Sequence, residues 1–550
     1  MNTRISKLLG TEVAEPSRIG KLQLPSPSEL GLDAERYPAW RADQADAIRK
    51  IRACTSTYQG ILAPTGFGKT LTIVGHALWS KERTLIVVAT KGLQDQIAKD
   101  VPGIHDVRGQ GNYDCHKALC SVAEAPCHAG MRCELKVDGC DYFDDIRLAR
   151  EMPLVVTNYQ LLFHKAREHR GLGTFDRIVF DEAHNIADEL AKFLTIHISS
   201  TELKNLGLSQ PPSEDWKPWA AGQTIHCSSL LLKSRSGAKT PDHVRQIHHL
   251  KSLKQKLSTL AKAKAENWLL THTQYGYTWD CIWPGAYAKR YLFKRASKFL
   301  LTSASIHPRM FQALAVPESE VSFTRYGSSF PVSRRPVYFY PTVKLAHNSE
   351  NHELEFWLSV IDLIIDQRAD RKGIIHTVSY DRAEYIRKRS RHSARMIGNR
   401  RREELPSAIA HFKVSRPGTV LVSPSITEGF DFPGPECEYI IIGKVPFGDT
   451  RSPIHRARSA RHRNYGILET CIELRQAAGR GMRYAEDHCE TFILDEQFEW
   501  LIRSFRAFFP GDFLDAVRHI KYLPPAPPPL PVPRKLLKKV VDSQSRPPLN

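Results

Sequence analysis

The stretch APTGFGKT, residues 63 to 70, follows the apolar run YQGIL and precedes a segment with a helical pattern. A strand, a glycine-rich turn and a helix start in this order form a phosphate-binding loop, because backbone N–H groups of the turn face a bound anion. Gly66 and Gly68 let the backbone close around phosphate oxygens, Lys69 supplies a charge to the β and γ phosphates, and Thr70 offers a hydroxyl to magnesium. The stretch therefore predicts an α/β domain that binds a nucleotide with Mg²⁺.

Apolar, β-branched runs that end in turn signals recur on both sides of this loop and predict strands. More helical intervals separate them, which indicates βαβ units around a parallel sheet. The runs fall into two groups, so two parallel-sheet domains are expected: YQGILAPTG, TLIVVAT, PLVVTN, RIVFDEAH and KFLLTSAS, then KGIIHTV, GTVLVSP, EYIIIGKVPF and ETFILDE. Between residues 190 and 290 these signals fade into lysine-rich, leucine-spaced sequence, which predicts a helical insertion.

The composition limits the class of protein. A chain of 550 residues is too long for one hydrophobic core, so two to four domains are expected. No apolar run is long enough for a signal peptide or a membrane span, which predicts a cytoplasmic protein without a membrane partner. The net charge of +19 predicts a polyanionic partner, either nucleic acid or an acidic lipid surface, and nucleic acid is favoured.

Two further motifs supply groups that the phosphate loop lacks. In RIVFDEAHN, residues 177 to 185, a buried strand ends at Asp181, suited to hold magnesium, and Glu182, suited to polarise an attacking water. In QAAGRGMR, residues 476 to 483, Arg480 and Arg483 have helical i, i+3 spacing, so both guanidinium groups are expected to project from one face. Such arginines stabilise the charge on a transferred phosphoryl group.

Five of the 11 cysteines lie between residues 112 and 143, separated as C-x4-C, C-x6-C, C-x5-C and C-x6-C. An odd total without a secretory signal favours a reducing compartment, where clustered cysteines more often bind metal than form disulfides. Neither the close pairs of structural zinc sites nor ferredoxin spacing is present. Spacing alone leaves an iron–sulfur cluster and zinc as equal alternatives, with a loop of free thiols third. His116 and His128 would be further ligands in the zinc alternative.

The order of APTGFGKT, TKGLQDQ, VVTNYQLL, DEAHN, LTSAS, SITEGFDFPG and QAAGRGMR resembles the motif series of superfamily 2 helicases, specifically the XPD/DinG-like branch. The resemblance covers roughly residues 36 to 500. RADQ resembles the glutamine motif that precedes the phosphate loop, and IIIGKVPFGDTRSP resembles the segment of the branch that ends in LPF and a proline turn. A cysteine group between the second motif and DEAH is the most specific shared feature.

The resemblance implies an ATP-dependent DNA helicase that moves 5′ to 3′ on single-stranded DNA and unwinds duplexes. Lys69, Glu182, Arg480 and Arg483 would be catalytic, and Thr70 and Asp181 would hold Mg²⁺. The residues implied to contact ATP are Gln44, Ala63, Pro64, Thr65, Gly66, Phe67, Gly68, Lys69, Thr70, Asp181, Glu182, His184, Gly429, Asp431, Gln476, Arg480 and Arg483. Ala63 replaces the first glycine of the general loop pattern.

In the same branch, four cysteines hold a [4Fe-4S] cluster that stabilises a small accessory domain where strands separate. The resemblance assigns Cys115, Cys127, Cys133 and Cys140 as ligands and leaves Cys120 spare. The insertion after DEAH corresponds to an Arch domain, with DNA passing between it and the cluster domain. Expected partners are single-stranded and forked DNA, with an RNA–DNA hybrid as an alternative, and the protein is expected to be a monomer acting in DNA repair or a related process.

The expected domains follow from these positions. They are an N-terminal lead-in (1–35), a first RecA-like motor domain (36–104, 151–190 and 291–325), an iron–sulfur domain (105–150), a helical Arch-like insertion (191–290), a second motor domain (326–522) and a proline-rich basic tail (523–550). The lead-in is too short for the exonuclease domain of some relatives, so no nuclease activity is expected. An alternative function is an ATP-gated clamp or remodelling subunit that binds nucleic acid without unwinding it.

Other residues have two interpretations. Basic runs at 289–298, 387–395 and 451–463 either grip phosphates or form solvated faces. Four tryptophans near the insertion either stack on bases or pack in the core, and packing is favoured: Trp216, Trp219, Trp268 and Trp283. The tail either is solvated or docks on a protein partner.

Overall fold

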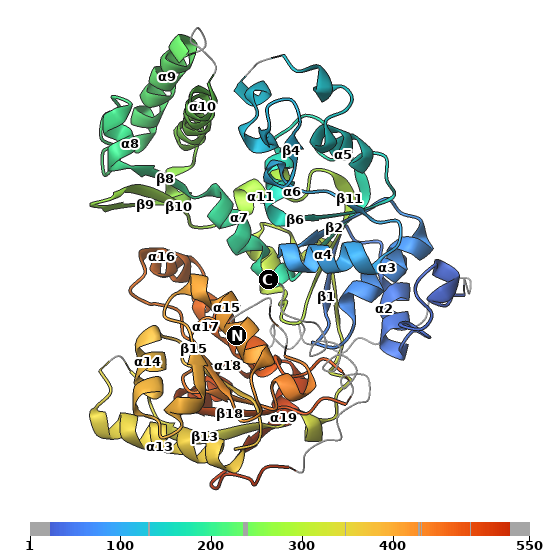
Figure 1. The fold of residues 1–550 in the computed structure, drawn as a ribbon, viewed down its shortest axis with the longest axis vertical. Helices are drawn as coiled ribbons and strands as arrows, with labels where there is room; N and C mark the ends of the chain where they lie inside the picture. The colour runs from blue at the N-terminus through green and yellow to red at the C-terminus, as the bar shows by residue number, and fades with distance from the viewer. Residues whose placement is uncertain are drawn as a thin grey trace, which may run out of the picture.

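The computed structural model describes residues 23–129, 132–234, 240–346, 348–426, 430, 432–484 and 486–527. Two domains, each built on a parallel sheet, lie one above the other, and two insertions extend from the upper domain (Figure 1). The α/β class and the two RecA-like sheets predicted from the sequence are confirmed. The lead-in up to residue 22 and the tail from residue 528 lie outside the described residues.

The first sheet has seven parallel strands in the order β12-β1-β11-β7-β2-β6-β3. Its strands are β1 (Tyr58–Leu62), β2 (Thr84–Val88), β3 (His105–Asp106), β6 (Leu154–Asn158), β7 (Phe175–Asp181), β11 (Ala296–Ser303) and β12 (Val321–Arg325). Neighbouring residues of β2 pack into two different cores, Leu85 and Val87 into one and Ile86 and Val88 into the other. The sheet is therefore buried on both faces, as its continuous apolar runs predict.

Helices cover both faces of this sheet (Figure 1). They are α2 (Ala42–Ala53), α3 (Lys69–Ser80), α4 (Lys91–Asp100), α5 (Asp141–Ala149), α6 (Tyr159–Ala166), α7 (Ile186–Leu194), α11 (Gly285–Tyr291) and α12 (Arg309–Ala313). The side chains of Thr90 and Asn158 accept hydrogen bonds from the first turns of α4 and α6, which fixes where these helices begin.

The second sheet also has seven parallel strands, in the order β15-β16-β14-β17-β18-β13-β19. They are β13 (Val337–Val343), β14 (Gly373–His376), β15 (Met396–Gly398), β16 (Val420–Ser423), β17 (Tyr439–Ile442), β18 (Glu490–Asp495) and β19 (Val517–His519). The associated helices are α13 (Asn351–Gln367), α14 (Tyr380–Arg389), α15 (Leu405–Val414), α16 (Pro453–Arg461), α17 (Tyr465–Ala478), α18 (Gln497–Phe505) and α19 (Gly511–Ala516).

The insertion after β7 contains the predicted helices together with strands that were not predicted. It contains the helices α8 (Ser200–Asn205), α9 (Trp216–Ser234) and α10 (Pro241–Ala261), but also an antiparallel sheet of β8 (Ile196–Ser199), β9 (Trp268–Thr273) and β10 (Gly276–Cys281). Alternate residues of β10 are buried, namely Tyr277, Trp279 and Cys281. The strands were not predicted because the alternation of apolar and polar residues that marks them is short, is interrupted by a turn and adjoins a long leucine-spaced helix.

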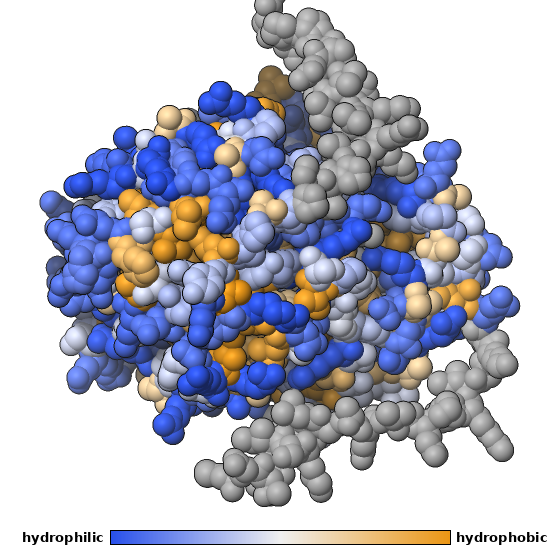
Figure 2. Space-filling model, turned by 90° about the horizontal axis from the view of Figure 1, so that it is seen from below, coloured by the Kyte–Doolittle hydropathy of each residue, from blue (hydrophilic) through white to orange (hydrophobic). Residues whose placement is uncertain are grey.

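The surface of the described residues is mainly hydrophilic, with apolar patches, in the view from below that faces the second domain (Figure 2). Phe356 and Leu363 of α13 are exposed apolar side chains. Within the described part of the chain, every helix is too short or too polar to cross a membrane.

Candidate nucleotide site and cysteine-rich segment

The phosphate loop joins β1 to α3 and is held from outside by α2. Gly66 and Gly68 have φ angles of 78° and 84°, a left-handed conformation that glycine adopts at low cost. The guanidinium group of Arg41 donates to the carbonyl of Gly66 at 2.8 Å, and Gln44 Nε2 donates to the carbonyl of Phe67 at 2.9 Å. A Cβ atom on Gly68 would lie 2.3 Å from Gln44 Nε2. The glutamine motif therefore supports the loop directly.

The two carboxylates lie at the end of β7, Asp181 as its last residue and Glu182 directly after it. The Lys69 Nζ atom lies 3.5 Å from Glu182 Oε1. Burial raises the pKa of Asp181 to about 6, and the neighbouring charge of Glu182 adds to the shift. Burial acts in the same direction on Glu182, but Lys69 and His184 outweigh it and hold its pKa below the usual range. Glu182 also has a left-handed φ of 48°, a strained backbone conformation of the kind found at functional sites.

A chain of hydrogen bonds joins these carboxylates to the second domain. Ser303, at the end of β11, donates to Glu182 at 3.1 Å and lies 2.7 Å from His184 Nδ1. The Nε2 atom of Gln476 in α17 lies 2.6 Å from His184 Nε2 and donates to Ser305 Oγ at 2.9 Å. The histidine of DEAH, both serines of LTSAS and the glutamine of QAAGRGMR thus form one bridge between the domains.

The two arginines lie after α17 and not on it. The helix ends at Ala478, so the prediction that both guanidinium groups project from one helical face was wrong, because Gly479 caps the helix first. Arg480 Nη1 donates to the carbonyl of Phe430 at 3.0 Å. Burial lowers the pKa of Arg483, and the charges of Glu182 and Asp181 oppose this shift, which locates Arg483 near these two carboxylates.

The other predicted nucleotide contacts have different positions. Ala63 is fully buried, and its N–H donates to the carbonyl of Ser303, so it joins the loop to β11. Pro64 and Thr65 line a cavity between the two domains. Gly429 and Asp431 lie outside the described residues.

Phe330, in the segment that connects the two sheets, was not predicted to belong to the site. A Cβ atom on Gly66 would lie 2.2 Å from Phe330 Cζ, so the ring packs directly on the phosphate loop. Arg475 was also missed: its side chain donates to the carbonyl of Ala304 at 2.7 Å and adds a second contact between α17 and the LTSAS segment. No sequence motif contains or adjoins Phe330, whereas Arg475 directly precedes the motif QAAGRGMR.

Four of the five clustered cysteines meet at one place. Cys115, Cys127, Cys133 and Cys140 line a single small cavity, together with apolar side chains such as Val122 and Leu135. All four are partly exposed thiols. Among the residues that the structure describes, no group of three His, Cys, Asp or Glu side chains could hold a single metal ion.

Cys120 does not line this cavity. It faces Cys115 across a small hairpin made of β4 (Asp114–Cys115) and β5 (Cys120–Ser121), in which the two cysteines are directly paired. His116, a candidate zinc ligand, also lines the cavity, and its Nε2 atom lies 3.0 Å from Asp141 Oδ2. The side chain of His128 lies outside the described part of the chain.

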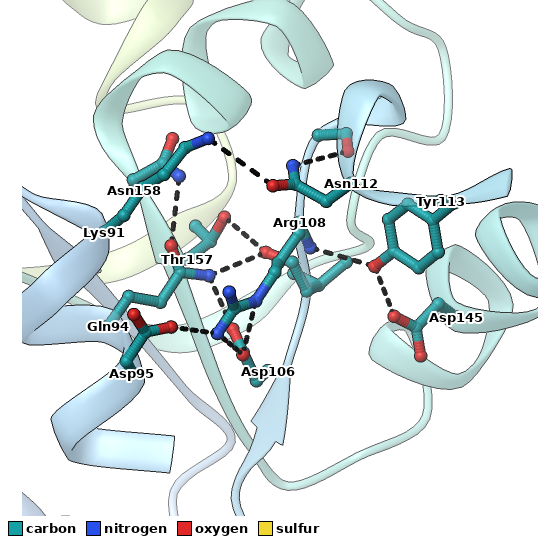
Figure 3. A network of polar contacts seen from close by, with 12 residues as sticks. Lys91, Gln94, Asp95, Asp106, Arg108, Asn112, Tyr113, Asp145, Thr157 and Asn158 are labelled. Carbon is teal, nitrogen blue, oxygen red and sulfur yellow. Dashed lines mark hydrogen bonds and ion pairs between the residues drawn. The ribbon is translucent and has the colours of Figure 1, made fainter. Parts of the chain in front are cut away.

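Figure 3 shows how the cysteine-rich segment is attached to the first sheet. The hydroxyl of Tyr113 accepts a hydrogen bond from the backbone of Arg108 at 3.1 Å and donates to Asp145 of α5. The Arg108 side chain donates to Asp106 at 2.8 Å and also pairs with Asp95 of α4. Residues on both sides of the cysteines are thereby fixed to one edge of the sheet.

Two motifs of the helicase series complete this network (Figure 3). Gln94 of TKGLQDQ donates to the carbonyl of Val107 at 3.0 Å and accepts from Asn158 of VVTN at 3.0 Å. Lys91 donates to Asn112 at 3.4 Å. Sequence reasoning had recognised both motifs without predicting that their side chains would connect the nucleotide domain to the cysteine-rich segment.

The insertion contacts both of its neighbours. Helix α10 packs against short turns at Val122–Glu124 and Pro126–Ala129, and Arg245 Nη1 lies 3.6 Å from Glu124. On the other side, Arg458 of α16 donates to the carbonyl of Ile282 in the insertion at 3.0 Å, and it also pairs with Asp188 of α7 in the first domain at 2.5 Å. Part of the basic run 451–463 therefore makes interdomain contacts and is not a solvated face.

The tryptophans near the insertion pack inside the protein. Trp216, Trp268 and Trp283 are at least nine-tenths buried. Trp219 stacks on Trp279 at a ring distance of 5.7 Å. The core-packing interpretation of all four is supported over base stacking.

Two parallel seven-stranded sheets, with a phosphate loop on the first and Arg483 of the second near Asp181 and Glu182, have the architecture of a two-domain nucleotide-driven motor protein. Residues 38–212 match a family model described as the res subunit of type III restriction enzymes, and residues 365–512 match a helicase C-terminal domain. The 3′-5′ exonuclease DinG of Bacillus subtilis (strain 168) is 31% identical over 96 residues, which span 16% of this chain and only 10% of that relative.

Solved structures agree on the fold. An XPD helicase structure has 17% identity and a TM-score of 0.59, covering 87% of this chain and 98% of that one. The S. tokodaii Xpd4 structure has 14% identity and a TM-score of 0.56, covering 87% and 100%. These solved structures show the fold, and the two family-model matches and the motif order are similar to those of the XPD/DinG-like branch of helicase superfamily 2.

Proposed function

We propose that this protein is an ATP-dependent DNA helicase that moves 5′ to 3′ on single-stranded DNA and unwinds duplexes. The observation that carries this proposal is the hydrogen-bonded bridge from Glu182 through Ser303 and His184 to Gln476. It links a group positioned for hydrolysis to a helix of the other domain. Hydrolysis can then move one domain relative to the other, which is what a translocating motor requires.

Within the cleft, the roles follow from position. Lys69 would neutralise the β and γ phosphates, Thr70 and Asp181 would hold Mg²⁺, and Glu182 would orient the attacking water. Arg483 is suited to stabilise the developing phosphoryl charge, because its guanidinium group lies near the two carboxylates. Arg480, which bonds to Phe430, would link the nucleotide to the loop that contains Gly429 and Asp431.

The convergence of Cys115, Cys127, Cys133 and Cys140 on one cavity fits a [4Fe-4S] cluster. In such a cluster each thiolate binds a different iron, so the sulfurs need not reach one common ion, and four cysteines are the usual donor set. A bound cluster would cross-link four positions of a segment that has little regular secondary structure. The network around Arg108 and Gln94 would then transmit force from the motor to this segment.

The contact between α10 and the cysteine-rich segment supports an Arch-like role for the insertion. The two elements meet through Arg245 and Glu124, and in a strand-separating device DNA would pass between them. The net charge of +19 is consistent with gripping phosphates, which a motor must do irrespective of sequence. The same contacts suit an RNA–DNA hybrid. The domain boundaries given above, a monomeric state and a cytoplasmic location belong to this proposal.

The motor assignment is tested by strand displacement with anaerobically purified protein on duplexes that carry either a 5′ or a 3′ single-stranded tail. We expect unwinding from the 5′ tail alone, abolished in Lys69→Ala and retained in Lys99→Ala, a control at an exposed lysine. Opening from the 3′ tail would contradict the polarity. If neither duplex opens while DNA stimulates ATP hydrolysis, the protein is a clamp or remodelling subunit.

The cluster is tested separately by measuring iron per protein chain. Cys140→Ser should lose most of its iron and its visible absorbance, whereas Cys54→Ser, remote from the cavity, should retain both. Unchanged iron in Cys140→Ser would refute the ligand assignment.

A further inference from the structure

The five clustered cysteines divide into four that line the cavity and one that does not. Cys120 is the exception, and it is the direct cross-strand partner of Cys115, which does line the cavity. The two thiols are in hydrogen-bonding contact. The sulfur of Cys115 can therefore either serve as a ligand in the cavity or bond to Cys120.

The hairpin geometry permits a covalent bond between this pair. Directly opposed residues of antiparallel strands have Cα atoms about 4.5–5.5 Å apart, and disulfides form when this distance is about 4.4–6.8 Å. The hairpin is closed by hydrogen bonds from Leu119 N to the carbonyl of Cys115 at 2.8 Å and from Val122 N to the carbonyl of Tyr113 at 2.9 Å. No backbone rearrangement is needed to bring the two sulfurs together.

Access also favours this pair. Cys120 is partly exposed, and the neighbouring Leu119 at the hairpin tip is 91% exposed. Another pair of contacting thiols, Cys437 and Cys489, is fully buried beneath the arginine-containing loop, where an aqueous oxidant cannot reach it. Among the contacting thiol pairs of the described residues, the hairpin pair is the accessible one.

We propose that Cys120 is a redox-sensitive modification site that captures Cys115 as a disulfide and so removes one ligand of the cysteine-rich cavity. This inference rests on the proposed iron–sulfur ligand set. It gives the fifth cysteine a function: an oxidised hairpin cannot hold or rebuild the cluster until the disulfide is reduced.

The chemistry balances with a peroxide as oxidant. The Cys120 thiolate attacks hydrogen peroxide, an S–O bond forms as the O–O bond breaks, and hydroxide leaves and takes up a proton to give water. The sulfur of Cys115 then attacks the sulfenic sulfur of Cys120, so that an S–S bond forms and a second water leaves. Two thiols and one peroxide thus yield one disulfide and two waters, and a dithiol reductant reverses the result by exchange.

The sequence allows the bond to be mapped by mass spectrometry. Lys117 separates Cys115 from Cys120, so trypsin cleaves between them and the two peptides stay linked only if a disulfide joins them. Cleavage after Glu124 separates Cys120 from Cys127, which otherwise shares its tryptic peptide. The full chain is treated with hydrogen peroxide, the remaining thiols are alkylated, and iron is measured before treatment and after reconstitution with iron and sulfide.

Wild-type protein should give the Cys115–Cys120 cross-link as its main new disulfide. Its reconstituted iron should fall at least about fivefold and recover after dithiol treatment. Cys120→Ser and Cys120→Ala should lose less than about half of their reconstituted iron under the same treatment, and Cys54→Ser should behave like wild type.

A missing cross-link, or equal iron loss in wild type and both Cys120 variants, would overturn this inference alone. Iron that is absent before any oxidation would overturn the proposed cluster and, with it, the competition for Cys115. Circular dichroism of the Cys120 variants separates either result from misfolding.

Discussion

Glu469 of α17 offers a quantitative test of the contact between the two motor domains. Burial raises its pKa from the usual 4.5 to about 7, and the charge of Asp188 in the other domain adds to the shift. Arg458 and Tyr465 complete the cluster, since Arg458 pairs with Asp188 and lies 3.3 Å from the Tyr465 hydroxyl. The ionised form of Glu469 is therefore disfavoured in the folded, closed arrangement.

The sign of the pH dependence follows. An acid with a raised pKa binds more protons when folded than when unfolded, so stability is full below pH 4.5 and declines until the folded pKa near 7 is passed. A shift of this size, at about 1.4 kcal/mol per unit, corresponds to a loss of about 3 kcal/mol above pH 7. Glu469→Gln removes the charge and keeps a hydrogen-bonding side chain. Its gain in stability should be under about 1 kcal/mol at pH 5 and about 3 kcal/mol at pH 8.

Denaturant unfolding of wild type and Glu469→Gln at pH 5 and pH 8 measures this difference. Glu403→Gln, at an exposed position of the same domain, is the control and should change neither value by more than about 0.5 kcal/mol. The reasoning is refuted if Glu469→Gln has the same effect at both pH values or is destabilising at pH 8.

Two other predictions concern catalysis and stability. Arg483→Ala should lower ATP turnover by about a thousandfold while nucleotide binding persists, because the positive charge near Asp181 and Glu182 is lost. The control Arg503→Ala, on the exposed face of α18, should leave ATP turnover unchanged. Glu490→Gln should destabilise the second domain by about 3–5 kcal/mol in denaturant unfolding, because it breaks a buried pair with Arg368, and a change below about 1 kcal/mol would contradict this.

Much of the fold could be predicted because its signals are local. The apolar β-branched runs of β2 and β17 are buried on both faces, so each predicts a parallel strand by itself. The loop at Gly66 to Lys69 and the carboxylates at Asp181 and Glu182 are likewise recognisable from a few adjacent residues, and each contributes to the nucleotide site.

Features that depend on distant contacts could not be predicted in the same way. Phe330 has no motif, and only the tertiary fold brings its ring onto Gly66. The spacing of Arg480 and Arg483 indicates a helix, yet the chain leaves the helix before both residues. The division of the cysteines also depends on the tertiary fold, because Cys120 is closer in sequence to Cys115 than any of the three cysteines that share the cavity with Cys115.

The position of β11 has a consequence for synthesis on the ribosome. This strand lies between β1 and β7 in the first sheet, although it follows both insertions in the chain. The last clustered cysteine, Cys140, is made about 160 residues before β11 is complete, which is about 10–30 seconds of elongation. Until β11 is complete, β1 and β7 lack the strand that joins them. The cysteine-rich segment must therefore emerge, and meet any iron or oxidant in the cell, before the nucleotide domain that carries it can close.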